Sequence, residues 1–285
     1  MGKLRTFLTA LALSVLASTT LTATASADSP PRAGWNDWSC RPSAAHPEPV
    51  VLVHGLGANS WVNFLTLAPA LRSAGYCVYS ETYGETVLGG LAGGLAPMAD
   101  SAVEVGAFVD RVRAATGAAK VDIVGHSEGT TVPAYYIKHL GGAAKVDDFI
   151  GFGSNFRGTT LNGLASLAAA LGMQDLLTGV GCGACTDYLP GSAFLAKLND
   201  GPVAVPGPTY TSIVTRYDRV VTPYTSGLLT GDNVTNIVLQ DKCRLDSAGH
   251  LGLAIDPNVT QLVLNRLDPQ NTAPFRCLPF TTAGI

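Results

Sequence analysis

Apolar positions along the chain follow two alternating patterns. Short runs rich in apolar residues predict strands over residues 50–54, 77–79, 121–124, 146–152, 210–215 and 234–239, and residues 50–53 are apolar throughout, as is typical of a strand buried on both faces of a parallel sheet. Helical spacing of apolar residues predicts helices over 61–74, after Ser101, over 130–140 and over 257–267. This alternation predicts an α/β protein, with a mostly parallel sheet and helices on both faces. Since no internal repeat or low-complexity linker interrupts the order, we expect residues 28–285 to form one domain.

Local signals refine two of these helices. Ser101 and Glu104 have the spacing of a capping box, which predicts that the second helix begins there. Pro133 lies inside the third helix, which we expect to be bent at that point.

The connection at residues 154–209 is longer than one crossover helix requires. It contains an apolar stretch at 161–171, two cysteines and several glycines and prolines. Two interpretations remain open. The segment is either a surface excursion or a cap over the carboxyl ends of the strands, where ligands bind in such sheets. The Gly/Leu-rich loop at 84–97 is a second candidate for the rim of a site.

Residues 1–27 have the pattern of a secretory signal peptide. Lys3 and Arg5 give a basic start, residues 7–16 are mostly apolar, and residues 25–27 form an A-x-A cleavage site. The apolar run is shorter than the ~20 residues that a membrane span needs, and no other segment approaches that length. We therefore expect a cleaved signal peptide and a secreted mature chain without a transmembrane segment.

Composition narrows the possible partners. Charged residues make up 14% of the chain and hydrophobic residues 47%, with a mean hydropathy of +0.25. This composition suits a large core, and equally an exposed apolar surface around a lipid-binding mouth. Loss of Lys3 and Arg5 with the signal peptide would change the formal net charge from −3 to −5. The other basic residues are scattered without a basic stripe, so we expect no nucleic-acid partner.

All six cysteines follow residue 27. An even number in an exported chain favours three disulfides, and six cysteines allow fifteen connectivities. The pairs we expect are Cys40–Cys77, Cys182–Cys185 and Cys243–Cys277. The C-x-x-C spacing of Cys182 and Cys185 is also found in redox and zinc pairs, but neither a second such pair nor a histidine pair accompanies it. A small structural loop is therefore the favoured interpretation.

The segment 121–129, VDIVGHSEG, carries the clearest chemical signal. An apolar strand runs into a G-x-S-x-G motif that a helical segment follows. A sharp strand-to-helix turn of this kind exposes a serine hydroxyl in strained backbone geometry, and Gly125 and Gly129 allow the strand and helix to approach. The alternative is a chance match in a chain with 32 glycines. The flanking strand and helix favour a nucleophile elbow with Ser127 as the nucleophile.

A serine nucleophile needs a base, and the base needs an orienting carboxylate, in the chain order Ser, acid, His. Of the five histidines, His250 alone lies after the later strands; the others are His46, His54, His126 and His139. Asp218 follows the strand at 210–215, so it faces the same edge of the sheet. Three competing carboxylates are less well placed: Asp232 in a Gly-Asp-Asn turn, and Asp241 and Asp246 close in sequence to His250.

The negative oxygen of a tetrahedral intermediate needs backbone N–H donors, each worth ~3 kcal/mol. One donor is expected from Glu128, which follows the nucleophile. The other is expected from the turn after the first strand, where we choose Leu56.

Several segments together make the chain resemble the class 2 secreted bacterial lipases, which are α/β-hydrolases, and especially their actinobacterial branch. The resemblance covers most of the chain after residue 27 and is carried by VLVHG at 51–55, LAP at 67–69, GYCVY at 75–79, VDIVGHS at 121–127, TRYD at 215–218, VVTP at 220–223 and NVTN at 233–236 before Cys243.

The resemblance implies a triacylglycerol lipase or esterase that hydrolyses acylglycerol or other fatty-acyl esters without an organic cofactor. It also implies the triad Ser127, Asp218 and His250. The chain departs from the family at Glu128, where relatives often have Gln. A carboxylate there would oppose a developing oxyanion unless it is screened.

Two other functions remain open for the same motifs. A secreted acyltransferase would use the same triad, with an alcohol or sugar replacing water in the second step. A non-catalytic binding protein on this fold is a different class, against which the complete Ser/Asp/His order argues. No clear acidic loop supports a structural calcium, so we assign no metal site.

Overall fold

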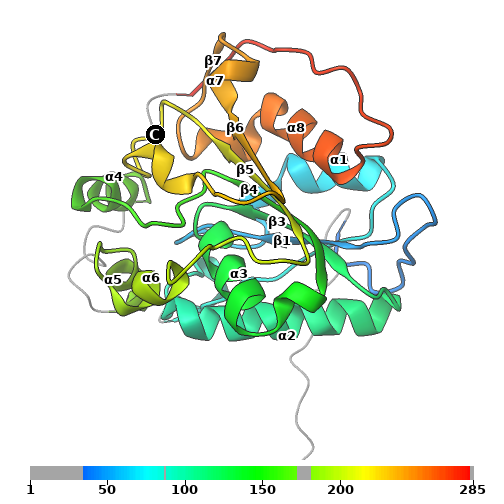
Figure 1. The fold of residues 1–285 in the computed structure, drawn as a ribbon, viewed down its shortest axis with the longest axis horizontal. Helices are drawn as coiled ribbons and strands as arrows, with labels where there is room; N and C mark the ends of the chain where they lie inside the picture. The colour runs from blue at the N-terminus through cyan, green and yellow to red at the C-terminus, as the bar shows by residue number, and fades with distance from the viewer. Residues whose placement is uncertain (1–34, 87, 172–180, 283–285) are drawn as a thin grey trace, which may run out of the picture. The chain divides into compact units, whose positions relative to one another are not determined.

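The computed structural model describes residues 35–86, 88–171 and 181–282 (Figure 1). The expected signal peptide at 1–27 lies outside the described residues.

Six parallel strands form the central sheet in the order β2-β1-β3-β4-β5-β6. Along the chain they are β1 (Val50–Val53), β2 (Val78–Ser80), β3 (Val121–His126), β4 (Val146–Phe152), β5 (Thr209–Val214) and β6 (Val234–Val238). Each corresponds to a strand predicted from the sequence, and the expected parallel α/β sheet is confirmed. Because all six strands run in one direction, their carboxyl ends meet at one edge, where ligands bind in such sheets.

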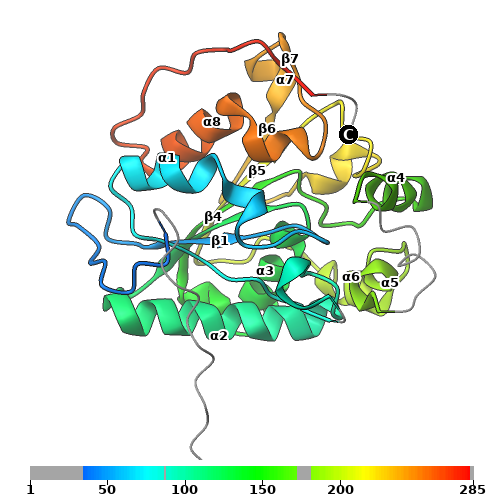
Figure 2. The ribbon, with the colours of Figure 1, turned by 180° about the vertical axis from the view of Figure 1, so that it is seen from behind.

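Helices cover both faces of the sheet, as Figures 1 and 2 show from opposite sides. Alternate residues of β1 enter two separate cores: Val51 and Val53 pack on one face, while Val50 and Leu52 pack on the other. The first core includes residues of α2 (Met98–Thr116) and α3 (Glu128–His139), and the second includes residues of α1 (Leu67–Ser73) and α8 (Pro257–Leu267). A strand buried on both faces must be apolar throughout, which explains the continuous runs.

Two helix predictions were wrong in detail. The expected helix at 61–74 is divided into η1 (Val62–Phe64) and α1. The capping box is absent, because α2 begins at Met98, three residues before Ser101. Its first N–H donates instead to Asp187 Oδ2 (2.8 Å), and Glu104 Oε2 accepts from the N–H of Gly84 (2.8 Å). Hydrogen bonds to residues distant in sequence have thus replaced the local hydrogen bonds of a capping box.

The long connection between β4 and β5 contains three helices: α4 (Leu161–Leu171), α5 (Gly183–Asp187) and α6 (Ala193–Leu198). Buried side chains of α4 and α6 join the same core as those of α2 and α3. The remaining short elements are η2 (Gly89–Leu91), η3 (Gly142–Ala144), η5 (Tyr224–Gly227), α7 (Leu239–Lys242), η6 (Gly252–Ile255) and a two-stranded sheet of β7 (Asp246–Ser247) and β8 (Phe280–Thr281).

The six cysteines form three disulfides, Cys40–Cys77, Cys182–Cys185 and Cys243–Cys277. These are the pairs expected from the sequence. The first ties the segment before β1 to the residue before β2, the second closes a small loop at α5, and the third holds the C-terminal segment beside α7. Within the described parts of the chain, no helix is both long and apolar enough to cross a membrane.

Candidate active site

Ser127 occupies a sharp turn between β3 and α3. Its backbone has φ +55° and ψ −121°, and among the described residues Asn36 is the only other non-glycine with a positive φ. A side chain at Gly125 would overlap the carbonyl group of Gly129, and one at Gly129 would overlap the carbonyl group of Val53. The turn therefore needs both glycines, and it holds Ser127 in the strained geometry expected of a nucleophile elbow.

The structure brings the three predicted chemical groups together at the carboxyl edge of the sheet. Ser127 Oγ lies 2.8 Å from His250 Nε2, and His250 Nδ1 lies 2.8 Å from Asp218 Oδ2. All three residues are buried. With its proton on Nδ1, donated to the carboxylate, His250 presents the Nε2 lone pair to the serine hydroxyl. This arrangement allows His250 to remove a proton from Ser127.

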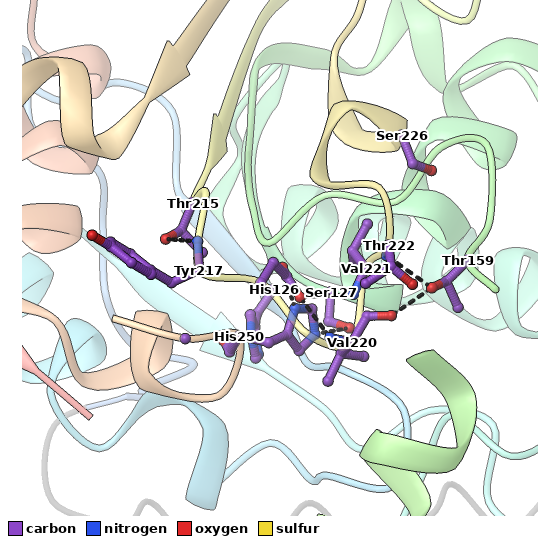
Figure 3. A network of polar contacts seen from close by, with 12 residues as sticks. His126, Ser127, Thr159, Thr215, Tyr217, Val220, Val221, Thr222, Ser226 and His250 are labelled. Carbon is purple, nitrogen blue, oxygen red and sulfur yellow. Dashed lines mark hydrogen bonds and ion pairs between the residues drawn. The ribbon is translucent and has the colours of Figure 1, made fainter. Parts of the chain in front are cut away.

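Asp218 is held by its own loop. Its Oδ1 accepts hydrogen bonds from the N–H groups of Val220 (2.9 Å) and Val221 (2.7 Å), which leaves Oδ2 for His250. Thr159 Oγ1 accepts from the N–H of Thr222 (3.0 Å) and donates to the carbonyl of Val220 (Figure 3). The long connection that contains Thr159 thus fixes the loop that carries the carboxylate.

A second threonine, Thr215, joins this loop to that of His250. Its Oγ1 donates to the carbonyl of Ala248 (2.8 Å), and it accepts from the N–H of Tyr217 (3.2 Å) and from Gln240 Nε2 (2.9 Å). Thr159 and Thr215 were missed by sequence reasoning. Thr215 lies in the TRYD segment that carried the family resemblance, which is the one signal that could have drawn attention to it.

Behind the serine, His126 links the first loop of the site to the last. Its Nε2 lies 3.1 Å from the carbonyl oxygen of His250, and its Nδ1 lies 3.1 Å from Asn63 Oδ1, which also accepts from the N–H of Gly55 (3.0 Å). Burial lowers the pKa of His126 to about 3, so the ring is neutral at neutral pH. A neutral ring has one N–H, so it can donate to one of these two acceptors at a time.

The two candidate oxyanion donors are free of internal partners. Among the residues that the structure describes, neither the N–H of Leu56 nor that of Glu128 has a hydrogen-bond acceptor. Both residues are buried, at the carboxyl ends of β1 and β3. Because buried N–H groups are nearly always paired in folded proteins, two unpaired ones beside a nucleophile are suited to bind an oxygen of a substrate.

The competing carboxylates do not reach His250. Asp241 forms an exposed ion pair with Arg216 (2.8 Å), and Asp232 is exposed. Asp246 is buried but accepts instead from the N–H of Ala248 (2.8 Å) and from Asn258 Nδ2 (2.7 Å).

Asp246 and Asp256 form a buried carboxyl pair at the two ends of the segment that carries His250. Asp246 accepts hydrogen bonds through both of its oxygens, whereas among the described residues Asp256 Oδ2 has no hydrogen-bond partner. Burial, then the contact with Asp246, raises the pKa of Asp256 to about 7. A group whose pKa is raised on folding stabilises the fold below its unfolded pKa, here 3.8, and this stabilisation is lost as the pH rises through the folded pKa.

We therefore expect the free energy of unfolding of the wild type to fall, relative to that of Asp256→Asn, as the pH rises from about 4 to about 7. Urea unfolding of both proteins across this range measures the difference. Asp232→Asn, at an exposed position, is the matched control and should follow the wild type. Parallel curves for wild type and Asp256→Asn would show that folding does not raise the pKa of Asp256.

The fold and this arrangement of side chains define an α/β-hydrolase. The family model "Lipase (class 2)" matches residues 47–263, and the chain belongs to that family.

Solved structures of lipases resemble this one. A lipase B of Aspergillus fumigatus superposes with a TM-score of 0.65 at 19% identity, over 83% of this chain and 57% of that one. The lipase BlEst2 of Bacillus licheniformis matches in its mature form with a TM-score of 0.57 at 18% identity, over 79% of this chain and 92% of that one. Its propeptide form matches over 54% of its length. This chain thus spans little more than half the length of the Aspergillus lipase and of the propeptide form of BlEst2.

Proposed function

We propose that the chain is a secreted lipolytic carboxylic ester hydrolase that cleaves fatty-acyl esters through an acyl-enzyme on Ser127. The observation that carries the proposal is the continuous contact from Ser127 Oγ through His250 to Asp218, at the strained turn after β3. Family membership supports the reaction class.

The proposed reaction has two steps. Ser127 Oγ attacks the ester carbonyl carbon while its proton passes to His250 Nε2, and the carbonyl oxygen becomes an alkoxide held by the N–H groups of Leu56 and Glu128. The alkoxide collapses, the C–O bond breaks, and the alcohol leaves with the proton from His250. Water then gives a proton to His250 and attacks the acyl carbon. The second collapse releases the acid and returns the proton to Ser127. Asp218 stabilises the imidazolium in both steps.

Secretion is part of the proposal. The signal-peptide pattern at 1–27 supports export, and three disulfides are typical of oxidising compartments. We also propose that residues 28–285 form one catalytic domain in which residues 154–209 serve as a cap. Its α4 packs directly on the acid loop, because a side chain at Gly163 would overlap the carbonyl oxygen of Val220.

Hydrolysis of p-nitrophenyl esters with acyl chains of two to about eighteen carbons tests the proposal. A maximum at long chains would identify a lipase, and a maximum at short chains would replace the fatty-acyl substrate with a small ester. No hydrolysis at any chain length would refute the proposed reaction.

Four exposed apolar side chains, on the segments that contain Leu56 and His250 or hydrogen-bonded to them, bear on the choice between these substrates. Val62, Leu65, Leu91 and Ile255 are 58%, 48%, 82% and 48% exposed, and we call them the apolar rim. Asn59 connects two of them, since it donates to the carbonyl of Leu91 (3.1 Å) and accepts from the N–H of Val62 (2.9 Å). Residues 54–71, 88–97 and 249–255, which carry the rim, contain no Asp, Glu, Lys or Arg. An uncharged apolar surface of this kind favours contact with a lipid–water interface.

The double variant Val62→Asp/Leu91→Asp should lower the hydrolysis rate of an emulsified long-chain triacylglycerol by tenfold or more, since each lost apolar contact removes about 1.5–3 kcal/mol. Hydrolysis of dissolved p-nitrophenyl acetate should change much less. Val103→Asp on α2, at a side chain that is 59% exposed, is the matched control. Equal losses on both substrates would show that the rim supports the site itself rather than an interface.

A further inference from the structure

Glu128 places an isolated carboxyl group next to the candidate nucleophile. It is the first residue of α3 and is fully buried. Its Oε1 lies 3.2 Å from the hydroxyl oxygen of Tyr83, and among the described residues its Oε2 has no hydrogen-bond partner. A buried ionised carboxylate normally accepts several hydrogen bonds or pairs with a cation. Glu128 therefore lacks the surroundings of an ion.

The count of protons at Tyr83 leads to the same conclusion. Its hydroxyl carries one proton and lies 2.8 Å from the carbonyl oxygen of His54, which can only accept. If Glu128 were ionised, two acceptors would compete for that proton. If Glu128 is protonated, its O–H donates to Tyr83, and Tyr83 donates to His54. The protonated arrangement satisfies both contacts with the protons available.

Among the described residues, the groups that face Glu128 offer no positive charge. They are Tyr83 from the loop after β2, and Asp187 and Tyr188 from the end of α5. Glu104 of α2 acts on Tyr83. His54, at the far end of the chain of contacts, is also neutral, since burial lowers its pKa to about 4. Burial, with the nearby Asp187 carboxylate, raises the pKa of Glu128 well above its ordinary range.

The same carboxyl group lies beside Gly94, which also lies close to the other candidate oxyanion donor. A side-chain carbon at Gly94, whose φ is +69°, would lie 2.9 Å from Glu128 Oε1 and 3.1 Å from Leu56 Cα. Beside it, Gly57 donates its N–H to the carbonyl of Gly93 (2.9 Å). Gly94 therefore lies close to both Glu128 and Leu56, and Tyr83 links Glu128 to the carbonyl of His54.

We propose that Glu128 is a positioning residue that acts as a neutral carboxylic acid. Its O–H holds the Tyr83 hydroxyl, which holds the His54 carbonyl, and this chain fixes the N–H of Leu56 relative to the N–H of Glu128 itself. The inference rests on the proposed function for the role of those two N–H groups. The protonated state of Glu128 and its bonds do not depend on it. A neutral acid also leaves a developing oxyanion unopposed, as the Gln of relatives would.

Glu128→Gln is the sharpest variant, because a glutamine amide can donate to Tyr83 at every pH. We expect the ratio of kcat in Glu128→Gln to kcat in the wild type to rise at least tenfold as the pH rises through the native pKa of Glu128, because the wild type loses this proton there. A merely structural glutamate would leave the ratio independent of pH.

Two measurements test the protonation of Glu128 and do not require that the protein hydrolyses an ester. The first is the ratio of the folding equilibrium constant of Glu128→Gln to that of the wild type. This ratio should rise about tenfold per pH unit, starting at pH 4.5, the ordinary pKa of a glutamate, and ending at the native pKa of Glu128. Infrared difference spectra of wild type against Glu128→Gln should contain the C=O band of a protonated acid at neutral pH. Tyr83→Phe, which retains the glutamate, should shift that band because the acceptor is lost.

The outcomes separate the two proposals. An ionised carboxylate band, or a folding ratio that does not change with pH, would overturn the role of Glu128. A protonated band in a chain that hydrolyses no ester would leave the neutral acid intact and refute the proposed function instead. A protonated band with a kcat ratio independent of pH would overturn its positioning role.

Discussion

Replacing Ser127 with alanine should lower kcat for ester hydrolysis by about 10⁶-fold, with little change in the fold. The reason is that the proposed reaction has no other nucleophile, and the loss of a serine nucleophile from a triad leaves the modest catalysis of substrate binding and oxyanion contacts. Alanine fits the turn because the strained φ of +55° is held by its neighbours rather than by the hydroxyl group. Hydrolysis of a p-nitrophenyl ester by wild type and Ser127→Ala measures the effect.

Ser101→Ala is the matched control for this experiment. Ser101 is also a buried serine, but it lies in α2, and among the described residues its Oγ has no hydrogen-bond partner. We expect the control to keep its activity and its labelling by a serine-directed organophosphate, and Ser127→Ala to lose both. Hydrolysis that survives in Ser127→Ala would exclude an acyl-enzyme on Ser127, whereas a wild type without hydrolysis would favour a binding protein on this fold.

The six strands of the sheet are predictable because burial on both faces permits few polar residues. Four consecutive buried valine and leucine residues form β1, and β4 has the predicted bounds although it also contains the aspartates 147 and 148. Helix ends were harder to predict. The Ser101…Glu104 pattern failed because Asp187 and Gly84, distant in sequence, supply the partners that a capping box would have provided. Local patterns cannot register such competition from tertiary contacts.

The chemical groups of the candidate site are more predictable than their supports. Ser127 lies in a motif, and the order of the chain selects one histidine. By contrast, Tyr83 contacts Glu128 across 45 residues, and Thr159 contacts Val220 across 61 residues. A single tyrosine or threonine carries no pattern that names its partner. The protonation of Glu128 cannot be predicted from the sequence either, because it follows from burial and from the count of protons at Tyr83.

The choice of Asp218 as the acid leads to the second large prediction. Its Oδ1 is occupied by the N–H groups of Val220 and Val221, and its Oδ2 faces His250 Nδ1. In Asp218→Asn the amide oxygen must stay with the two N–H donors, so the NH₂ group faces His250. His250 Nδ1 then has to accept, which moves the ring proton to Nε2 and points it at Ser127 Oγ. His250 can then no longer accept the proton of Ser127, although no heavy atom has moved.

We therefore expect Asp218→Asn to lower kcat by about 10⁴-fold while KM changes little, because the substrate does not contact this group. Asp241→Asn is the control: its carboxylate lies in the same part of the chain but forms an exposed ion pair with Arg216, and its removal should leave kcat unchanged. At high pH, hydroxide can partly replace the missing base. The difference in kcat between the wild type and Asp218→Asn should therefore become smaller as the pH rises. If Asp241→Asn or Asp246→Asn caused the larger loss, the carboxylate that orients His250 during turnover would not be the one that contacts it here.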